Sequence, residues 1–491
     1  MKHEQSLLDE IISRFAGLPV LVYNNVPSWR SQAPIAYEIV QRLRQAECDV
    51  HYFTCNGSLT SCPANPFKAP EKCNACRATS NQDIEKLLRP LQTKITLVSS
   101  SASTVQDFET FEAFTEFTYK GLPFGRLALS QLADDYKSYR FPMDIVNTRG
   151  RILIDGAISL FEQSLTLLSE NAIRCAFFWN GRRPSDGPVH FAAQVLGIPS
   201  FAYISGGDEG RFLVVEDLLH DPESVEVRIK DFYANIGEHV DKYLQRGVEY
   251  AEGTRLGTNS AFGSSTYSRN FKNENFPLPP KGKPRILVCT STTWETIAFD
   301  QKNPIKNHEE HFQFLTKMLH DPHILLNYQV MVRWHPNQTN VQYHEARDIQ
   351  DLIQSTRKTV IHYSPESLVS TYDLILASDF IITYGSTVGV EATIMGKPSI
   401  SITENFLASL GILYYARDFL HLTQLLDFKA PALPPEPAIL YLGYQKTLGE
   451  PYRNFKYDAD SGFYLYERYA VAKLNSLKAL WLRVRAKFSR Y

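Results

Sequence analysis

Apolar runs and polar turns alternate along this chain in a recurring order, in which an apolar run is followed by a polar turn and then by an amphipathic stretch. Short apolar runs rich in β-branched and aromatic residues predict buried strands. Strands that alternate with helices favour a parallel sheet. The predicted strands are Leu18–Tyr23, Val50–Thr54, Ile95–Ser99, Cys175–Trp179, Ser200–Ile204, Arg285–Cys289, Gln329–Arg333, Thr359–His362 and Asp379–Thr383.

Apolar residues three or four positions apart predict helices between these strands. The predicted helices are residues 3–16, 34–46, 104–120, 126–139, 152–170, 189–196, 308–319, 341–354 and 388–395.

A proline-rich segment divides the predicted elements into two series. Phe271–Pro284 (FKNENFPLPPKGKP) has four prolines and no periodicity, as expected of a linker. We predict an α/β protein with two Rossmann-like domains, each with a parallel sheet, that face an interdomain cleft. They are an N-terminal domain over residues 1–275 and a C-terminal domain over 285–430, followed by an extension over 431–491. A chain of 491 residues is long enough for such domains to have full cores.

Composition and charge narrow the class of protein. A hydrophobic content of 44% and a charged content of 21% are those of a soluble globular protein. The net charge of −2 argues against a nucleic-acid partner. The N-terminal residues carry early acids and no apolar segment, so we expect no signal peptide. No apolar run approaches the length of a membrane span, so we expect a cytoplasmic protein.

The segment Asp379–Ile400 (DFIITYGSTVGVEATIMGKPSI) reads as strand, turn, helix and strand. The free N–H groups and partial positive charge of a helix N-terminus suit a phosphate. Gly385 would let the backbone approach, Ser386 and Thr387 would add hydroxyl donors, and Glu391 could reach a ribose hydroxyl. A hydroxyl that merely caps the helix is the simpler interpretation of the same turn.

Polar residues follow other strands of the second half. Ser291 and Thr292 follow Arg285–Cys289, and His335 and Asn337 follow Gln329–Arg333. Ligands of parallel sheets bind beyond the carboxyl ends of the strands. We therefore predict a nucleotide-sugar site on this rim, where His335 contacts phosphate and offsets charge on the leaving nucleotide.

Two loops of the first half carry candidate residues for the other substrate. Asn180 and Arg182 follow Cys175–Trp179, and Arg182 could bind an anionic substrate or be surface charge. Asp208 and Glu209 lie in a glycine-flanked loop after Ser200–Ile204. One of these acids could be a general base, whereas a solvated turn is the simpler interpretation.

These motifs together resemble those of GT-B glycosyltransferases. The triplet Asp208-Glu209-Gly210, the pair His335-Pro336 and the pair Ser386-Thr387 resemble motifs of bacterial CMP-sugar transferases, which include sialyltransferases and the Kdo transferases of capsule and lipopolysaccharide synthesis. The loop Asn180-Gly181-Arg182 is similar to one in capsule polysaccharide biosynthesis proteins. The resemblance covers roughly residues 175–210 and 285–402.

The resemblance implies transfer of a sugar from a nucleotide-activated donor to a glycan or lipid-linked glycan, in surface polysaccharide biosynthesis and without a metal in catalysis. It implies that the acidic motif supplies the base, and that His335, Ser386 and Thr387 bind the phosphate of the donor. Which of Asp208 and Glu209 acts stays open. Two alternatives remain, a UDP-sugar transferase or 2-epimerase-like enzyme, and a non-catalytic scaffold that binds glycan or nucleotide.

Four of the seven cysteines cluster within 22 residues of the polar loop that follows Val50–Thr54. Cys55, Cys62, Cys73 and Cys76 have the ligand number of a structural zinc site, although the first pair is spaced C-x6-C rather than C-x2-C. Reduced structural thiols and a redox pair are the other interpretations.

The last residues predict a basic amphipathic helix. Apolar residues recur at helical spacing from Leu474 to Phe488, basic residues fill the other faces, and no acid follows Lys473. Such a helix could hold the protein on an anionic membrane surface, or pack its apolar face on the first domain.

Overall fold

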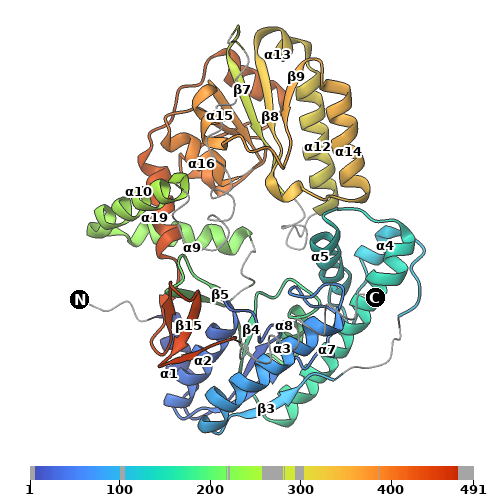
Figure 1. Ribbon diagram of the computed structural model, residues 1–491, viewed down its shortest axis with the longest axis vertical. Helices are drawn as coiled ribbons and strands as arrows, with labels where there is room; N and C mark the ends of the chain where they lie inside the picture. Colours follow the sequence, from blue (N-terminus) through green and yellow to red (C-terminus); the bar gives the residue numbers. More distant parts are fainter. Residues whose placement is uncertain are drawn as a thin grey trace. The chain divides into compact units, whose positions relative to one another are not determined.

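The computed structural model describes residues 6–99, 105–216, 218, 222–256, 280, 282–292, 304–384 and 386–473. The chain divides into two compact units (Figure 1). Unit 1 comprises Met1–Asp135, Pro142–Val225 and Leu448–Tyr491, and unit 2 comprises Tyr136–Phe141 and Glu226–Thr447. Each unit has its own largely parallel sheet with helices, so the predicted α/β class with two Rossmann-like domains is confirmed. The cleft stays a prediction.

Unit 1 contains a seven-stranded sheet in the order β13-β6-β5-β4-β1-β2-β3. The five strands from β5 to β3 run parallel, and β6 and β13 extend the sheet antiparallel. Every residue of β4 is buried, as expected of a continuous apolar strand covered on both faces, whereas β3 is the half-exposed edge. The strands are β1 (Pro19–Asn24), β2 (Asp49–Thr54), β3 (Lys94–Leu97), β4 (Cys175–Trp179), β5 (Ser200–Ser205), β6 (Arg211–Val215) and β13 (Glu450–Pro451).

The helices of unit 1 pack mainly against this sheet and against one another. The long helix α7 lies along α8, and it buries a mainly apolar stripe that includes Leu153, Ala157, Phe161 and Leu168. The helical segments are α1 (Leu7–Phe15), α2 (Ala33–Gln45), α3 (Pro70–Asp83), η1 (Ile84–Leu88), η2 (Arg89–Leu91), α4 (Phe111–Thr115), α5 (Phe124–Tyr136), α6 (Met143–Ile145), η3 (Val146–Gly150), α7 (Arg151–Glu170) and α8 (Gly187–Val195).

Unit 2 contains a six-stranded, fully parallel sheet in the order β12-β11-β10-β7-β8-β9. Strand β7 is central and buried at all five residues. The strands are β7 (Arg285–Cys289), β8 (Gln329–Arg333), β9 (Val360–Tyr363), β10 (Phe380–Thr383), β11 (Ser399–Ser401) and β12 (Tyr414–Tyr415).

Two helices of unit 2, α10 and α19, lie side by side (Figure 1). Glycines make their close approach possible, because a Cβ on Gly443 would lie 2.0 Å from the Tyr243 carbonyl oxygen. The helical segments are α9 (Pro222–Asn235), η4 (Gly237–His239), α10 (Val240–Leu256), α12 (Pro304–His320), α13 (Pro322–Asn327), η6 (Pro336–Gln338), α14 (Tyr343–Thr356), α15 (Thr371–Ala377), α16 (Thr387–Ile394), α17 (Phe406–Ser409), α18 (Phe419–Asp427) and α19 (Glu436–Thr447).

After α19 the chain returns to unit 1, where a three-stranded sheet covers part of the core. The sheet consists of β14 (Lys456–Asp458), β15 (Phe463–Tyr466) and β16 (Tyr469–Ala470). Buried side chains of this segment, Phe455, Tyr464 and Val471, belong to the same apolar cluster as β1 and α2.

Buried polar contacts also hold the returning segment on unit 1. Arg42 pairs with Glu450, and the Glu38 carboxylate accepts the backbone N–H groups of Arg453 and Asn454. Asp83 accepts hydrogen bonds from the Tyr469 hydroxyl at 2.5 Å and from the Ala472 N–H at 3.1 Å.

Four regions differ from the sequence predictions. Residues 226–256 belong to unit 2 although the predicted first domain ran to residue 275, and the returning segment belongs to unit 1 rather than to a separate extension. Within the described residues of the predicted helix 104–120, only Phe111–Thr115 is an α-helix. Cys73 and Cys76 lie on α3 rather than in a loop, since Pro70 at its N1/N2 position supports helix initiation.

One helical stretch, Met143–Glu170, is long and apolar enough to cross a membrane by length and composition, which differs from the sequence prediction. Of the most apolar window in that stretch, 39% is buried inside the protein. A single such helix is weak evidence, because core helices of soluble proteins have the same length and composition. It is the one helix of this kind within the described part of the chain.

Candidate functional site

In the sheet of unit 2, the order in which successive strands are added reverses between β7 and β10. From β7 the chain adds β8 and then β9 on one side, and it then places β10 on the other side of β7. Ligands of open parallel sheets bind at such a switch point, beyond the carboxyl ends of the strands. Ser291 and Thr292 follow β7, and Ser386 follows β10, so the predicted phosphate residues flank this point.

A network of hydrogen bonds fixes the loop that carries His335 next to the β7 loop. The His335 N–H donates to Thr290 Oγ1 and to Gln338 Oε1, both at 2.9 Å. Thr290 Oγ1 in turn donates to Gln338 Oε1 at 2.7 Å. Thr290 and Gln338 are both buried. His335 therefore has a defined position one strand away from the switch point.

The His335 ring is held in one tautomer. Its Nδ1 accepts the Asn337 N–H at 3.1 Å, which leaves the proton of the neutral ring on Nε2. Burial, and to a smaller extent the nearby Arg333 guanidinium, lower the pKa of His335 to about 4. At neutral pH His335 is thus a neutral ring whose Nε2–H can donate to a phosphate oxygen.

The predicted phosphate turn ends in a capped helix. Ser386 is the N-cap of α16, and its Oγ accepts the Val388 N–H at 3.4 Å. Thr387 is the first residue of the helix and is exposed, so its hydroxyl can reach a ligand. The capping interpretation thus holds for Ser386. A phosphate role stays open, because the cap uses the Val388 N–H as donor, whereas a phosphate would accept from the Ser386 hydroxyl or from other N–H groups of the helix N-terminus. Gly385 lies outside the described residues.

Glu391 lies in the middle of α16, with buried residues on both sides in sequence. Burial raises the pKa of its carboxyl to about 7, and a hydrogen bond from the Tyr372 hydroxyl opposes that rise. Burial, followed by the same pairing with Glu391, raises the pKa of Tyr372. Tyr372 comes from α15 and was not predicted as a site residue. A partner 19 positions away in sequence leaves no signal in a local motif.

Ser291 is half-buried and Thr292 is buried beyond the end of β7. Asn337 is half-buried on η6, and its backbone N–H donates to Nδ1 of the His335 ring. These three residues and His335 come from adjacent strands of one sheet, whereas Ser386 and Glu391 come from the other side of the switch point.

In unit 1 the predicted substrate residues are part of a buried polar network. Asn180 is 3% exposed and has a φ of 58°, directly after β4. Arg182 and Arg183 both pair with one Asp134 oxygen, at 2.9 Å and 2.7 Å. Arg182 is therefore not free surface charge, because its charge is shared with Asp134. Its role toward an anionic substrate stays a prediction.

Asp208 and Glu209 occupy the turn that joins β5 to β6. Asp208 Oδ1 accepts the Gly210 N–H at 2.9 Å, and its carbonyl accepts the Arg211 N–H at 3.1 Å. Glu209 is 7% exposed. The pKa of the Tyr464 hydroxyl is raised mainly by burial, and the charges of Glu209 and Asp208 raise it further. Asp208 thus shapes the turn, and Glu209 is the more enclosed acid.

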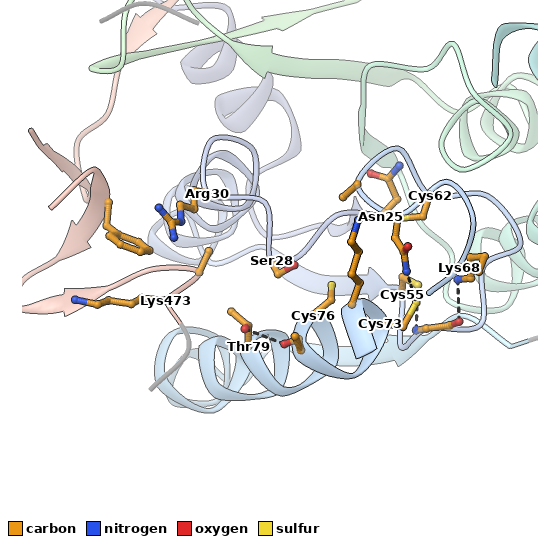
Figure 2. Close-up of a pocket in the computed structure, with 17 residues that line it drawn as sticks. Asn25, Ser28, Arg30, Cys55, Cys62, Lys68, Cys73, Cys76, Thr79 and Lys473 are labelled. Atoms are coloured by element: carbon orange, nitrogen blue, oxygen red, sulfur yellow. Dashed lines mark hydrogen bonds between the residues drawn. The ribbon is translucent and has the colours of Figure 1, made fainter. Parts of the chain in front are cut away.

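The four clustered cysteines line a single pocket of about 660 Å³ in unit 1 (Figure 2). Cys55, Cys62 and Cys73 lie at one end of the view, and Cys76 lies further along α3. Burial raises the pKa of Cys62 to about 11 and raises that of Cys76, so both are protonated thiols near neutral pH.

Within the part of the chain that the structure describes, no three side chains of His, Cys, Asp or Glu are grouped as a metal ion requires. Cys73 Sγ instead accepts a hydrogen bond from Asn65 Nδ2 at 3.2 Å, and Cys55 Sγ accepts the Gly57 N–H at 3.2 Å. A zinc ion would have to displace these contacts and the thiol protons. The zinc site stays a prediction, to be tested by metal analysis of the pure chain.

The basic amphipathic helix predicted after Lys473 lies outside the described residues. The proposed membrane contact therefore has no structural account.

No family model matches the chain, and no curated protein matches it either. Solved structures do match it in part. A Thermosulfurimonas dismutans KpsC, a beta Kdo 2,4 transferase, has 13% identity and a TM-score of 0.36, over 57% of this chain and 85% of that one. A UDP-GlcNAc 2-epimerase from Neisseria meningitidis, bound to UDP-GlcNAc, has 12% identity and a TM-score of 0.33, over 87% and 97%.

MurG of Acinetobacter baumannii has 10% identity and a TM-score of 0.28, over 87% of this chain and 94% of that one. The set thus includes a Kdo transferase, a class that the sequence motifs resemble, and an epimerase, an alternative that they left open. At such identities and TM-scores, the function has to be inferred from the site itself.

Proposed function

We propose that the chain is a glycosyltransferase that moves a sugar from a nucleotide-activated donor to a glycan hydroxyl. One observation carries the proposal. The Ser291–Thr292 loop and the N-terminus of α16 flank the switch point of one parallel sheet, and the neutral His335 donor follows the adjacent strand β8. Hydroxyls, a neutral N–H donor and a helix N-terminus together suit the phosphate of a nucleotide.

In this proposal each residue has a stated role. The N-terminal N–H groups of α16, with the Thr387 hydroxyl, bind the donor's phosphate. His335 Nε2–H donates to a phosphate oxygen and stabilises the charge that develops as the nucleotide leaves. Glu391 accepts a ribose hydroxyl, and the chemistry needs no metal because these groups already offset the phosphate charge.

The acceptor is a glycan or lipid-linked glycan of bacterial surface polysaccharide biosynthesis, as the motif resemblance implies. The base that removes its proton is Glu209, because Glu209 is 7% exposed and is the more enclosed of the two acids. The donor we favour is a CMP-sugar of the Kdo or sialic acid type, and a UDP-sugar is the alternative.

Thermal unfolding of the full chain with CMP, CDP, UDP and GDP tests the nucleotide site. We expect one cytidine nucleotide to raise the Tm, because a ligand that binds only the folded state stabilises it. His335→Ala should abolish most of that rise. His320→Ala is the matched control, because His320 is exposed at the end of α12 and bonds only its own helix within the described residues.

A rise with UDP alone would favour the UDP-sugar enzyme. No rise with any of the four nucleotides would contradict the nucleotide site and favour the scaffold. A rise that His335→Ala leaves unchanged would remove His335 from the site. In a transfer assay with a donor identified in this way, His335→Ala should lower kcat about 10²- to 10³-fold.

A further inference from the structure

The pocket lined by the cysteines lies at the carboxyl ends of β1 and β2 in the unit 1 sheet. Asn25 directly follows β1 and Cys55 directly follows β2, and both line the pocket. The switch point of this sheet lies between β1 and β4, since β2 and β3 lie on one side of β1 and β4 and β5 on the other. A pocket of about 660 Å³ in this position has the size and place of a small-molecule site.

The charged residues that line the pocket are all basic. Arg30, Lys68, Lys72 and Lys473 line it, and no aspartate or glutamate does. Figure 2 shows Lys68 beside Cys55, Cys62 and Cys73, with Arg30 and Lys473 toward the other end. An excess of one sign of charge in a concave site concentrates ligands of the opposite sign.

The contacts of these cations do not neutralise them. Lys68 Nζ donates to the Gly57 carbonyl at 3.0 Å, which is a neutral partner. The Arg30 guanidinium lies 4.0 Å and Lys473 Nζ 5.2 Å from the centre of the Phe463 ring. Among the described residues none of the four cations has a carboxylate partner. The four positive charges are therefore available to a ligand.

Cys62 and Cys76 do not offset this charge, because burial raises the pKa of both thiols and keeps them neutral at physiological pH. The pocket also offers a neutral acceptor. Asn25 is 2% exposed, and its Nδ2 donates to Ser185 Oγ at 2.9 Å and Asp186 Oδ2 at 3.2 Å. Its Oδ1 has no hydrogen-bond partner among the described residues. A water molecule or a ligand hydroxyl satisfies a buried acceptor of this kind.

We propose that this pocket binds a saccharide that carries a phosphate or carboxylate group. The oxyanion contacts Lys68, Lys72, Arg30 or Lys473, and a hydroxyl of the sugar donates to Asn25 Oδ1. The site is built from residues of unit 1 alone, so it stands whether or not unit 2 binds a nucleotide.

Calorimetric titration of the full chain with glucose 6-phosphate, glucuronate and glucose tests the proposal. We expect one site for at least one of the two anionic sugars, with an affinity that falls as salt is added, and no site for glucose. The anion that binds more tightly identifies phosphate or carboxylate as the preferred group.

Lys72→Glu should weaken that binding at least tenfold. Lys86→Glu is the matched control, because it makes the same change in net charge at an exposed lysine of unit 1 outside the pocket. Asn25→Asp replaces the Nδ2 donor with a second carboxylate oxygen and adds a negative charge to the pocket lining, so it should also weaken binding of an anionic sugar. His335→Ala should leave it unchanged, which separates this site from the nucleotide site.

Three results would overturn the proposal. They are no heat with either anion, equal affinities for glucose and the anions, or equal losses for Lys72→Glu and Lys86→Glu. Binding that disappears when a chelator removes zinc would overturn it as well, because a metal rather than the cations would then hold the ligand.

Discussion

At the scale of single residues, His335 shows how burial selects a chemical role. Its surroundings disfavour the imidazolium form, and the Asn337 N–H fixes the tautomer. A donor without a full charge can stabilise a leaving phosphate without binding it too tightly to release. Because the pKa is about 4, His335 should contribute no pH dependence to nucleotide affinity between roughly pH 5.5 and 8.

The two acids of the β5–β6 turn can be separated by amide substitutions. Asp208→Asn keeps the Oδ1 acceptor for the Gly210 N–H, so we expect the turn and the transfer activity to be retained. Glu209→Gln removes the proposed base and should lower kcat about 10²- to 10⁴-fold. Steady-state transfer rates, with circular dichroism as a check on folding, decide between them. The reverse pattern would make Asp208 the base.

Glu391 should make the stability of the protein depend on pH. Its carboxyl has an ordinary pKa of 4.5 when unfolded and about 7 when folded, so the folded chain binds more protons between these values. The stability that Glu391 contributes is then fully present below about pH 4.5 and is lost as the pH rises through 7.

Glu391→Gln keeps an acceptor for Tyr372 and has no charge to bury. We expect the variant to have a higher Tm than the natural chain at pH 8, and the two values to converge at pH 5. Scanning calorimetry at both pH values measures the difference. A lower Tm for the variant at pH 8 would mean that the carboxylate is stabilised by groups other than Tyr372.

At the scale of elements, the contact between α10 and α19 depends on two glycines. A Cβ on Gly247 would lie 1.9 Å from the Ile439 carbonyl oxygen, and one on Gly443 would lie 2.0 Å from that of Tyr243. The helices can approach this closely only where neither carries a side chain. The contact is part of unit 2, and it explains why residues 226–256 pack there.

Gly443→Ala should therefore force the two helices apart and lower the free energy of unfolding by about 1–3 kcal/mol. Gly282→Ala is a suitable control, because a Cβ there meets nothing within 4 Å. Urea denaturation of both variants gives the comparison. Equal stabilities would mean that α10 and α19 shift without cost.

The strands could be predicted from the sequence because most of them are buried apolar runs. Cys175–Trp179, Arg285–Cys289 and Gln329–Arg333 match β4, β7 and β8 at both ends. Short edge strands such as β12 and β13 gave no such run, since two residues carry no periodicity. The Cys73–Cys76 helix was missed because α3 is polar on most faces and buries only three side chains.

The site could be predicted only as far as local motifs extend. His335, Ser386 and Glu391 follow strands, and parallel pairing brings strand ends to one edge, so their common location was predictable. Their roles toward a substrate stay predictions. Tyr372, Asp134 and Lys473 were missed, because each contacts its neighbours through tertiary packing between distant segments.

At the scale of the whole molecule, the charge of −2 is unevenly distributed, because the residues after Lys473 are basic and without acids. We expect the full chain to co-sediment with vesicles that contain phosphatidylglycerol, and less so at high salt. A chain that ends at Lys473 should not co-sediment. This end keeps Ala472, whose N–H donates to Asp83, so unit 1 retains that anchor. Equal sedimentation of both chains would exclude the tether.

The return of the chain to unit 1 also affects the order in which the two units can complete folding during translation. Phe455, Tyr464 and Val471 belong to the unit 1 core, yet they are translated after every residue of unit 2. The part of unit 1 that precedes residue 226 therefore has an incomplete core, with some apolar surface uncovered, while unit 2 is translated. Unit 2 is the first half of the protein that can finish folding, although it is encoded second.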